Sequence, residues 1–316
     1  MNVTKKYDVI CVGMALVDSI IKGFNPEPIS ASGFRAESAS LNVGGEAVNE
    51  AMAASKLGLT TGIFCSLGKD AAGDMVAAAL ESCGVDTGLI LRSAEHATPV
   101  TTMFVSSDGT RKSITNGAHR YNFHPEQDTN RFTDAKALIL GSLFRAPFDD
   151  PEIVHDVLLA AKENGQFVFA DTKLPNFIFL KLEDLHSSAP MIDYITPNED
   201  EAHYYTGETD PEKMADVFLQ WGAKNVVIKL GGEGCYFKNA AESFLLPAYP
   251  IHAVDATGAG DNFLAGFASE ILRESTHEAA LHFANACGSI CSTAVGAGTA
   301  LKSREQVLTF MAEKGQ

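Results

Sequence analysis

The stretch Ala253–Phe267, AVDATGAGDNFLAGF, places Gly258, Ala259 and Gly260 between two aspartates and then enters an apolar segment. The large apolar residues that follow recur at the spacing of one helix face: Phe263, Leu264, Phe267, Ile271 and Leu272. We therefore expect a helix over 259–274, with the small residues at its start. Unpaired backbone N–H groups and the positive end of the helix dipole make such a start an anion site.

Asp261 lies in the first turn of this predicted helix. A carboxylate beside an anion site repels a bare anion, but it suits a site where a hydroxyl attacks a phosphoryl group and must lose its proton. The alternative is that Asp261 complements the helix dipole while the glycines shape a tight turn. The stretch by itself leaves both interpretations open.

The remainder of the chain predicts an α/β fold. Six short apolar runs predict buried strands over 7–13, 61–68, 135–142, 166–171, 192–197 and 225–232. Helical patterns alternate with them over 46–57, 70–83, 151–164 and 210–222. This alternation predicts one domain over 1–316, in which helices sandwich a mostly parallel central sheet and ligands bind outside the carboxyl ends of the strands.

Two segments interrupt the alternation, 32–43 and 99–116, and neither has a helical pattern of its own. In the second, two β-prone runs meet at Ser107-Asp108-Gly109, which indicates a hairpin turn. We expect a small β-sheet lid, formed by about 16–43 and 98–122, over the strand ends of the main sheet. The alternative is an extension of the sheet edge with no functional role.

Charge and composition exclude several classes of protein. A formal net charge of −16 argues against a nucleic-acid partner, although magnesium, a helix N-terminus and a few local cations can still hold a single nucleotide. No apolar run approaches the roughly 20 residues that span a bilayer, and no signal peptide is evident, so we expect a cytoplasmic protein without a membrane partner. The six cysteines show no CxxC pair and are expected to be reduced, mostly buried thiols.

The two common glycine-rich nucleotide motifs do not fit. A dinucleotide-binding GxGxxG would need glycine at position 263, where Phe263 stands, and no GxxxxGK[ST] occurs. If the protein uses ATP, it does so without a P-loop. A Rossmann dehydrogenase remains as an alternative enzyme class that NAD(H) binding would test.

The segment 193–207, DYITPNEDEAHYYTG, carries a second candidate site. Asn198 and Glu201 have the spacing of a helix capping box, and that interpretation needs no ligand. The competing interpretation is a magnesium environment formed by the carboxylates of Glu199, Asp200 and Glu201 at a strand end.

The segment 41–58, LNVGGEAVNEAMAASKLG, carries a third. Gly44 and Gly45 would let a polyol approach the main chain, and Asn49 with Asp18 would hydrogen-bond its hydroxyls. The alternative is a helix-start turn with an incidental polar residue.

Together these segments resemble the ribokinase (PfkB) family of carbohydrate kinases, and the similarity runs across nearly the whole chain. Residues 41–58 resemble the N-terminal family signature, and 255–268 resemble the C-terminal signature with its Gly-Ala-Gly-Asp core. Asn198 and Glu201 match the NxxE motif of the family. The resemblance implies a ribokinase-like three-layer α/β/α sandwich with a β-sheet lid, and an enzyme that transfers the γ-phosphoryl group of ATP to a hydroxyl of a small sugar.

The resemblance also implies roles for individual residues. Asp261 would be the catalytic base, with Gly258, Ala259 and Gly260 as the anion hole. Asn198 and Glu201 would organise Mg²⁺ and the triphosphate. The sugar hydroxyls would contact Asp18, Gly44, Gly45 and Asn49. The nucleotide would lie near Lys229, Gly231, Gly234 and Asn285. Asp255 would help to hold K⁺, although Ala256 stands where the family usually has Thr, Ser or Pro.

The resemblance leaves the acceptor open. Ribokinases carry Lys after the paired glycines where this chain has Glu46, which makes ribose less expected because a carboxylate cannot donate hydrogen bonds. Sugar acids would need a cation in the pocket, from Arg111, Arg120, Arg145 or Lys173. The segment FADTKLPNF, 169–177, also lacks the Asp-x-Asn-x-Arg pattern of many fructokinases. A nucleoside kinase of the same fold and a non-catalytic sugar- or nucleotide-binding homologue remain alternatives, and a homodimer through the lid is expected.

Overall fold

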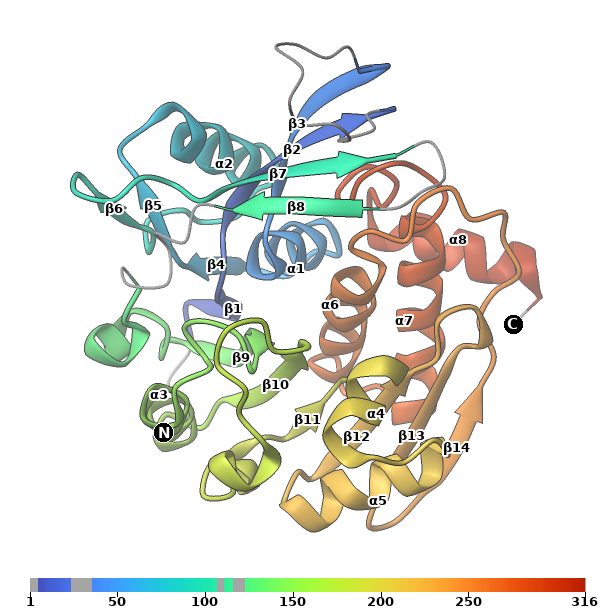
Figure 1. Cartoon of the computed structure of the whole chain (residues 1–316). Helices are drawn as coiled ribbons and strands as arrows, with labels where there is room; N and C mark the ends of the chain where they lie inside the picture. Colours follow the sequence, from blue (N-terminus) through green and yellow to red (C-terminus); the bar gives the residue numbers. More distant parts are fainter. Residues whose placement is uncertain (1–4, 24–35, 107–110, 116–122, 316) are drawn as a thin grey trace.

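A computed structural model describes residues 5–23, 36–106, 111–115 and 123–315. These residues form an eight-stranded central sheet in the order β14-β13-β12-β11-β10-β9-β1-β4 (Figure 1). The parallel strands are β1 (Tyr7–Val12), β4 (Thr61–Phe64), β9 (Ala135–Leu143), β10 (Phe167–Thr172), β11 (Tyr194–Ile195) and β12 (Asn225–Lys229). Two antiparallel strands, β13 (Cys235–Asn239) and β14 (Ser243–Leu246), complete one edge. The predicted mostly parallel sheet is confirmed.

The central strands are mostly apolar because both faces of the sheet are covered. In β1, Val9 and Cys11 belong to one hydrophobic core, and Ile10 and Val12 belong to the core on the opposite face. Since successive side chains of a strand alternate between faces, a continuous apolar run is what a doubly covered sheet requires.

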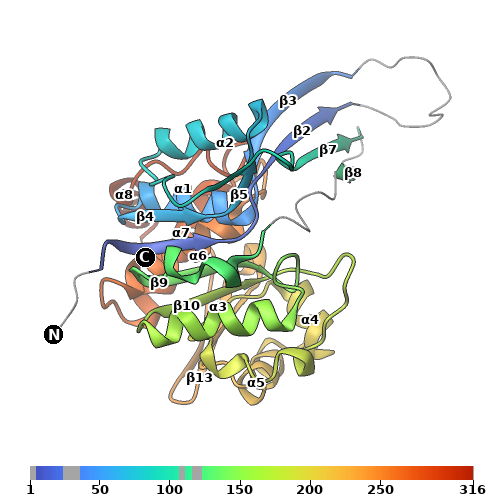
Figure 2. The same ribbon diagram turned by 90° about the vertical axis from the view of Figure 1, so that its left-hand side faces the viewer.

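Helices cover each face of the sheet (Figures 1 and 2). One layer contains α1 (Glu46–Lys56), α2 (Ala71–Ser82), α6 (Ala259–Ile271), α7 (His277–Cys291) and α8 (Arg304–Lys314). The other contains α3 (Pro151–Glu163), α4 (Glu199–Thr206) and α5 (Pro211–Trp221). Short 3₁₀ turns are η2 (Pro125–Arg131), η3 (Leu182–Leu185), η4 (Ala189–Met191) and η5 (Gly231–Glu233). This is the predicted α/β/α sandwich, with α4, which the capping-box interpretation allowed, and with α7 and α8 added by the structure.

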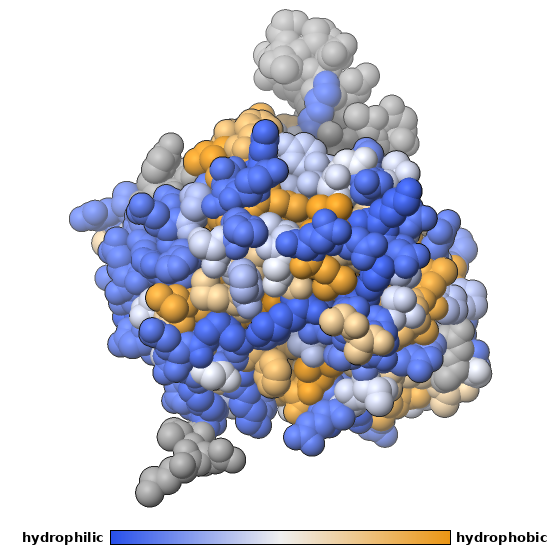
Figure 3. All heavy atoms as spheres, turned by 90° about the horizontal axis from the view of Figure 1, so that it is seen from below, coloured by the Kyte–Doolittle hydropathy of each residue, from blue (hydrophilic) through white to orange (hydrophobic). Residues whose placement is uncertain are grey.

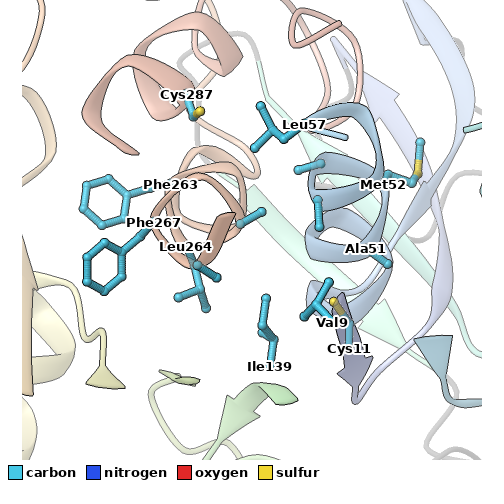
Figure 4. Packing of buried hydrophobic residues seen from close by; sticks show 14 of the residues in the cluster. Val9, Cys11, Ala51, Met52, Leu57, Ile139, Phe263, Leu264, Phe267 and Cys287 are labelled. Carbon is cyan, nitrogen blue, oxygen red and sulfur yellow. The ribbon is translucent and has the colours of Figure 1, made fainter. Parts of the chain in front are cut away.

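Close packing of α1 on α6 brings two distant parts of the chain together. Figure 4 shows α1 beside α6, with Leu57, the residue that follows α1, and Leu264 of α6 on their facing sides and Val9 and Ile139 of the sheet below. The small side chains of α1, an alanine-rich helix, let the two backbones approach. The consequence is that the first turns of both helices open at the same edge of the sheet.

A second sheet, β3 (Ser38–Gly44), β2 (Leu16–Lys22), β7 (Val100–Val105) and β8 (Arg111–Thr115), extends away from the main body (Figure 2). Its strands match the predicted small sheet, whereas the predicted turn at 107–109 lies outside the described residues. Leu41 and Ile114 on this sheet are exposed. Its function as a lid stays a prediction. The short strands β5 (Ser66–Gly68) and β6 (Leu91–Ser93) pair separately.

The surface in Figure 3 is a mixture of hydrophilic and hydrophobic residues. None of the helices in the described ranges combines the length and the apolar character needed to cross a membrane. All six cysteines are free thiols, and only Cys83 among them is not fully buried, as expected.

Candidate active site

The first turn of α6 is built by a glycine that no other residue could replace without strain. Gly258 precedes the helix with φ 76°, and a Cβ atom there would overlap the side chain of Ala297. The Asn262 side-chain amide donates to the carbonyls of Gly258 (2.8 Å) and Ala297 (2.9 Å), which holds the loop against the helix. Two segments that are about forty residues apart in the chain are thereby locked together at the helix start.

Most of the N–H groups in this turn are free to bind an anion. Among the described residues, none accepts a hydrogen bond from the N–H groups of Gly258, Gly260 or Asp261. The N–H of Ala259, by contrast, donates to the Ala256 carbonyl at 3.1 Å. Of the predicted anion hole, the two glycines therefore present available donors, and Ala259 already has an acceptor within its own turn.

Asp255 connects two loops at this site. One carboxylate oxygen accepts from the N–H (3.0 Å) and the hydroxyl (2.7 Å) of Thr257, and the other accepts from the Gly296 N–H at 3.0 Å. This carboxylate therefore shapes the loop before α6. Its predicted part in binding K⁺ stays a prediction.

The Asp261 carboxylate is 5% exposed and is held by a residue of the facing helix. The Asn49 side-chain amide, from α1, donates to Asp261 Oδ2 at 2.7 Å. Burial raises the pKa of Asp261, whereas the Lys173 ammonium, 4.0 Å from Oδ1, opposes that rise. The predicted substrate residue Asn49 thus also orients the predicted base.

A lysine pair neutralises the carboxylates beneath Asp261. Lys173 Nζ lies 3.5 Å from Asp171 Oδ2 and 3.9 Å from Glu46 Oε1. Lys229 Nζ donates to Asp171 Oδ1 at 2.6 Å. Burial opposes the ionisation of Asp171, but Lys229 and Lys173 together lower its pKa. Burial likewise opposes the charge of Lys173, and the surrounding carboxylates still raise its pKa well above the usual range.

One cavity of about 510 Å³ opens above these groups and has the character of an acceptor pocket. Asp18, Gly45, Glu46, Arg145, Lys173 and Asp261 are among its lining residues. Burial and the nearby Glu46 raise the pKa of Asp18 to about 6. Gly44 lies directly behind Asp18, where a Cβ atom would meet the carboxylate. The predicted sugar-contacting residues therefore gather in one place, while Arg120 lies outside the described residues.

A second cavity of about 370 Å³ adjoins the first and is mostly apolar. It is lined by four of the five predicted nucleotide-contacting residues, Lys229, Gly231, Gly234 and Asn285. The fifth, Asn198, lines the acceptor pocket. The two cavities share Lys229, Gly231, Ala256 and Gly260, so they meet at the first turn of α6.

Asn198 and Glu201 form the capping box of α4. Glu201 N–H donates to Asn198 Oδ1, and Asn198 N–H donates to Glu201 Oε2, each at 2.9 Å. Glu201 is buried and also accepts from the Thr172 hydroxyl at 2.9 Å, whereas Glu199 and Asp200 are exposed. The prediction that all three carboxylates form one magnesium environment is wrong, because successive positions in a helical turn point in different directions.

Residues 6–304 match the family model described as pfkB family carbohydrate kinase. The chain belongs to this family. It is an ATP-dependent carbohydrate kinase, as the resemblance predicted. The dehydrogenase alternative is thereby excluded.

Relatives of this kinase agree on family and fold. A ribokinase of Haemophilus influenzae is 28% identical over 276 residues, which cover 85% of this chain and 87% of the relative. The structure of Arabidopsis thaliana ribokinase complexed with ribose and ATP has a TM-score of 0.84 at 27% identity, covering 96% of this chain and 98% of the other. A putative ribokinase II from E. coli, in complex with ATP and Mg²⁺, has a TM-score of 0.80 at 26% identity, covering 97% and 99%. The ribokinase-like fold is confirmed.

Three charged residues of this kinase site were missed or only partly foreseen. Asp171 and Glu50 were not predicted, and Lys173 was named only as a possible pocket cation. A signal existed for Glu50, since it interrupts the apolar run of the helix EAVNEAMAASK. For Asp171 the signal was its place at the carboxyl end of a buried strand, where ligand sites form.

Proposed function

We propose that this kinase transfers the γ-phosphoryl group of ATP to a hydroxyl of a small sugar or sugar derivative, with Asp261 as the base and backbone N–H groups of the α6 start as the anion hole. The observation that carries this proposal is the junction of the two cavities. Gly260 borders both of them, and the Asp261 carboxylate faces the acceptor side. A phosphoryl group held at this junction has the nucleotide on one side and the attacking hydroxyl on the other.

The nucleotide cavity supports a position for ATP. Its apolar walls, including Tyr249 and Phe263, suit a purine ring, and Asn285 offers an amide near one end. Gly231 of η5 and Gly234, the residue that follows it, let phosphates approach the backbone. Lys229 borders both cavities and is the cation best placed to contact the triphosphate. Its ammonium group would then bind a phosphate oxygen as well as the Asp171 carboxylate.

The residues around Asn198 fit a magnesium ion held through water. Glu201 is fixed behind Asn198 by three hydrogen bonds, so it can anchor ordered water molecules rather than contact the ion directly. When bound, Mg²⁺ neutralises the charge of the phosphate oxygens. Asn198 lines the acceptor pocket, on the side that Lys229 shares with the nucleotide cavity.

Asp261 accepts the proton of the attacking hydroxyl in this proposal. In a loose transition state the hydroxyl loses its proton late, so a carboxylate of modest basicity suffices. Lys173 favours the ionised form that a base needs, and the Asn49 amide holds one oxygen so that the other can face the acceptor. Alignment and the N–H groups of Gly258 and Gly260 supply most of the acceleration.

The acceptor class follows from the pocket lining. Asp18 and Asn49 present hydrogen-bonding groups to hydroxyls, and the bare backbone of Gly45 allows close approach. Arg145 and Lys173 also line the pocket, which meets the condition stated for sugar acids and keeps them in the set to be tested.

Two further parts of the proposal concern a monovalent cation and the assembly of the enzyme. The K⁺ site beside Asp255 is proposed from the family resemblance. The Asp255 carboxylate itself accepts three hydrogen bonds from the protein, which hold the loops around that site. A homodimer through the lid is supported by the exposed apolar side chains of Leu41 and Ile114. The K⁺ site is tested by measuring activity as a function of KCl concentration, and the homodimer is tested by sedimentation velocity.

The proposed function is tested by an acceptor screen. Hexoses, pentoses, sugar phosphates, sugar acids and nucleosides are incubated with ATP and Mg²⁺, and both ADP release and the phosphorylated product are measured. We expect one sugar or sugar derivative to give stoichiometric product. A clear preference for nucleosides would establish the nucleoside-kinase alternative, and ADP release without any phosphorylated acceptor would contradict the proposal.

A further inference from the structure

Glu50 lies beneath the proposed base and has no role in the mechanism above. Its side chain is fully buried in α1, and neither carboxyl oxygen has a hydrogen-bond partner among the described residues. Oxygen atoms of Glu50, Asp171 and Asp261 all lie within 4.8 Å of one another. An ionised carboxylate in that position is strongly disfavoured, because nothing replaces the water that it loses.

Without Glu50, the carboxylates in this cluster already outnumber the cations. Lys229 and Lys173 provide two positive charges, which face the two carboxylates of Asp171 and Asp261. Glu46, on the preceding turn of α1, adds a further negative charge near Lys173. A negative Glu50 would therefore be a fourth carboxylate against the same two cations.

Lys173, after β10, is the cation that acts on Glu50, and the described residues of β1 and β9 beside it add none. On β1 the nearby titratable group is the buried thiol of Cys11. On β9 the neighbouring residue is Gly141, which has no side chain, and a Cβ atom there would come within 2.9 Å of Glu50 Oε2. The missing side chain at Gly141 thus leaves space for the Glu50 carboxyl group but provides no positive charge to pair with it.

We propose that Glu50 is a neutral carboxylic acid in the working enzyme and donates its one O–H hydrogen bond, directly or through one water molecule, to the carboxylate of Asp171 or Asp261. It is a positioning residue that acts through Asp261, so its catalytic effect rests on the proposed function. The direction of its pKa agrees, because burial first, and then the neighbouring charges of Asp261, Asp171 and Glu46, raise it well above the usual range. A neutral donor here restrains the base without adding to its negative surroundings.

The first test does not depend on catalysis. Infrared spectra of protein labelled with ¹³C at glutamate carboxyl groups are compared between wild type and Glu50→Gln at pH 8. We expect a protonated-carboxyl carbonyl band in the wild type that is lost in Glu50→Gln. Identical spectra for the two proteins would overturn the proposal even if Asp261 proves to be the base.

The second test separates positioning from a structural role, and uses Glu50→Gln and Glu50→Met as matched variants. Glutamine keeps a donor and should retain kcat within about threefold, whereas methionine keeps the volume and should lower kcat about tenfold with the KM for ATP unchanged. Circular dichroism checks that both variants fold. Equal kcat values for the two variants would contradict the proposal.

The pH profile of Glu50→Gln distinguishes a neutral acid from an anion. If Glu50 is neutral, the acid limb of the kcat/KM profile lies at the same pH in Glu50→Gln as in the wild type. If it is an anion about 5 Å from Asp261, its removal moves that limb to lower pH by more than about one unit, which would overturn the proposal. Loss of a bound metal ion in Glu50→Gln, measured by elemental analysis, would instead show that the three carboxylates hold a cation.

Discussion

The two cavities that meet at α6 are assembled from the chain in opposite ways. The nucleotide cavity is lined only by residues between 229 and 292, and many of them are small or apolar. The acceptor pocket draws its lining from residues as far apart as Leu16 and Asp261, and it contains three carboxylates and three cationic side chains. One segment of the chain therefore forms the nucleotide cavity, whereas the acceptor pocket forms only when segments far apart in the sequence have packed together.

This difference indicates where specificity resides. A cavity made from one segment can keep its shape while the remainder of the chain varies. The acceptor pocket combines Asp18 of β2, Glu46 of α1 and Lys173 after β10, so changes in any of these elements alter what it binds. Variants of the acceptor pocket should therefore change catalysis and acceptor affinity, and variants of the nucleotide cavity should change only ATP affinity.

Asp261→Asn should have the largest effect. It removes the base but preserves the shape of the side chain, so we expect kcat to fall by about 10²–10⁴-fold with the KM for ATP nearly unchanged. Steady-state kinetics give both values, and the thermal unfolding midpoint serves as the folding control. A correctly folded variant with near-normal turnover would remove the role assigned to Asp261.

Lys173→Met should have the next largest effect. Without this ammonium, burial and the neighbouring carboxylates raise the pKa of Asp261 further, and the acid limb of kcat/KM should move to higher pH by about one unit or more. Loss of a buried counter-charge should also cost about 3 kcal/mol of stability. Lys162→Met is the matched control, because Lys162 pairs with Asp193 and does not line either cavity. A similar shift in the control would show that the effect is not specific to the pocket.

Asp18→Asn should weaken acceptor binding about tenfold, because a charge-assisted hydrogen bond to a hydroxyl is lost, and should leave the KM for ATP unchanged. In the wild type, Asp18 ionises at about pH 6, so the KM for the acceptor should rise as the pH falls through 6, and the variant should lack this dependence. A profile that is the same in both proteins would exclude Asp18 as the titrating group.

Asp18→Asn should weaken acceptor binding but increase the stability of the folded protein. The pKa of Asp18 in the folded protein, about 6, exceeds the ordinary value of 3.8, so between these pH values the native state binds more protons than the unfolded chain. Its contribution to stability therefore falls as the pH rises from 4 to 6. At pH 7 Asp18→Asn should raise the unfolding midpoint by on the order of 2 °C, and by less at pH 4.

Asn285→Leu should have the smallest effect and should be confined to the nucleotide. The Asn285 amide donates to the Pro247 carbonyl at 3.3 Å and lines only the nucleotide cavity. We expect the KM for ATP to rise about threefold to tenfold, with kcat and the KM for the acceptor unchanged. A large loss of kcat would show that the two cavities are not as separate as the comparison suggests.

The same contrast explains what could be predicted from the sequence. The start of α6 is encoded locally, by Gly258 and Gly260 followed by an apolar helix face, so the helix start and the position of Asp261 in its first turn could be predicted. The lysine pair could not, since Lys173 reaches Asp261 only because α6 packs above the end of β10. Likewise, Glu50 meets Asp171 only after α1 has packed on the sheet.

The most direct test of the central claim is a crystal structure with a non-hydrolysable ATP analogue, Mg²⁺ and the acceptor found in the screen. We predict that the terminal phosphate lies about 3 Å from the N–H groups of Gly258 and Gly260, with the Asp261 carboxylate facing an acceptor hydroxyl. A terminal phosphate bound away from the start of α6, or an Asp261 carboxylate turned into a direct ion pair with Lys173 while the acceptor is bound, would contradict the account.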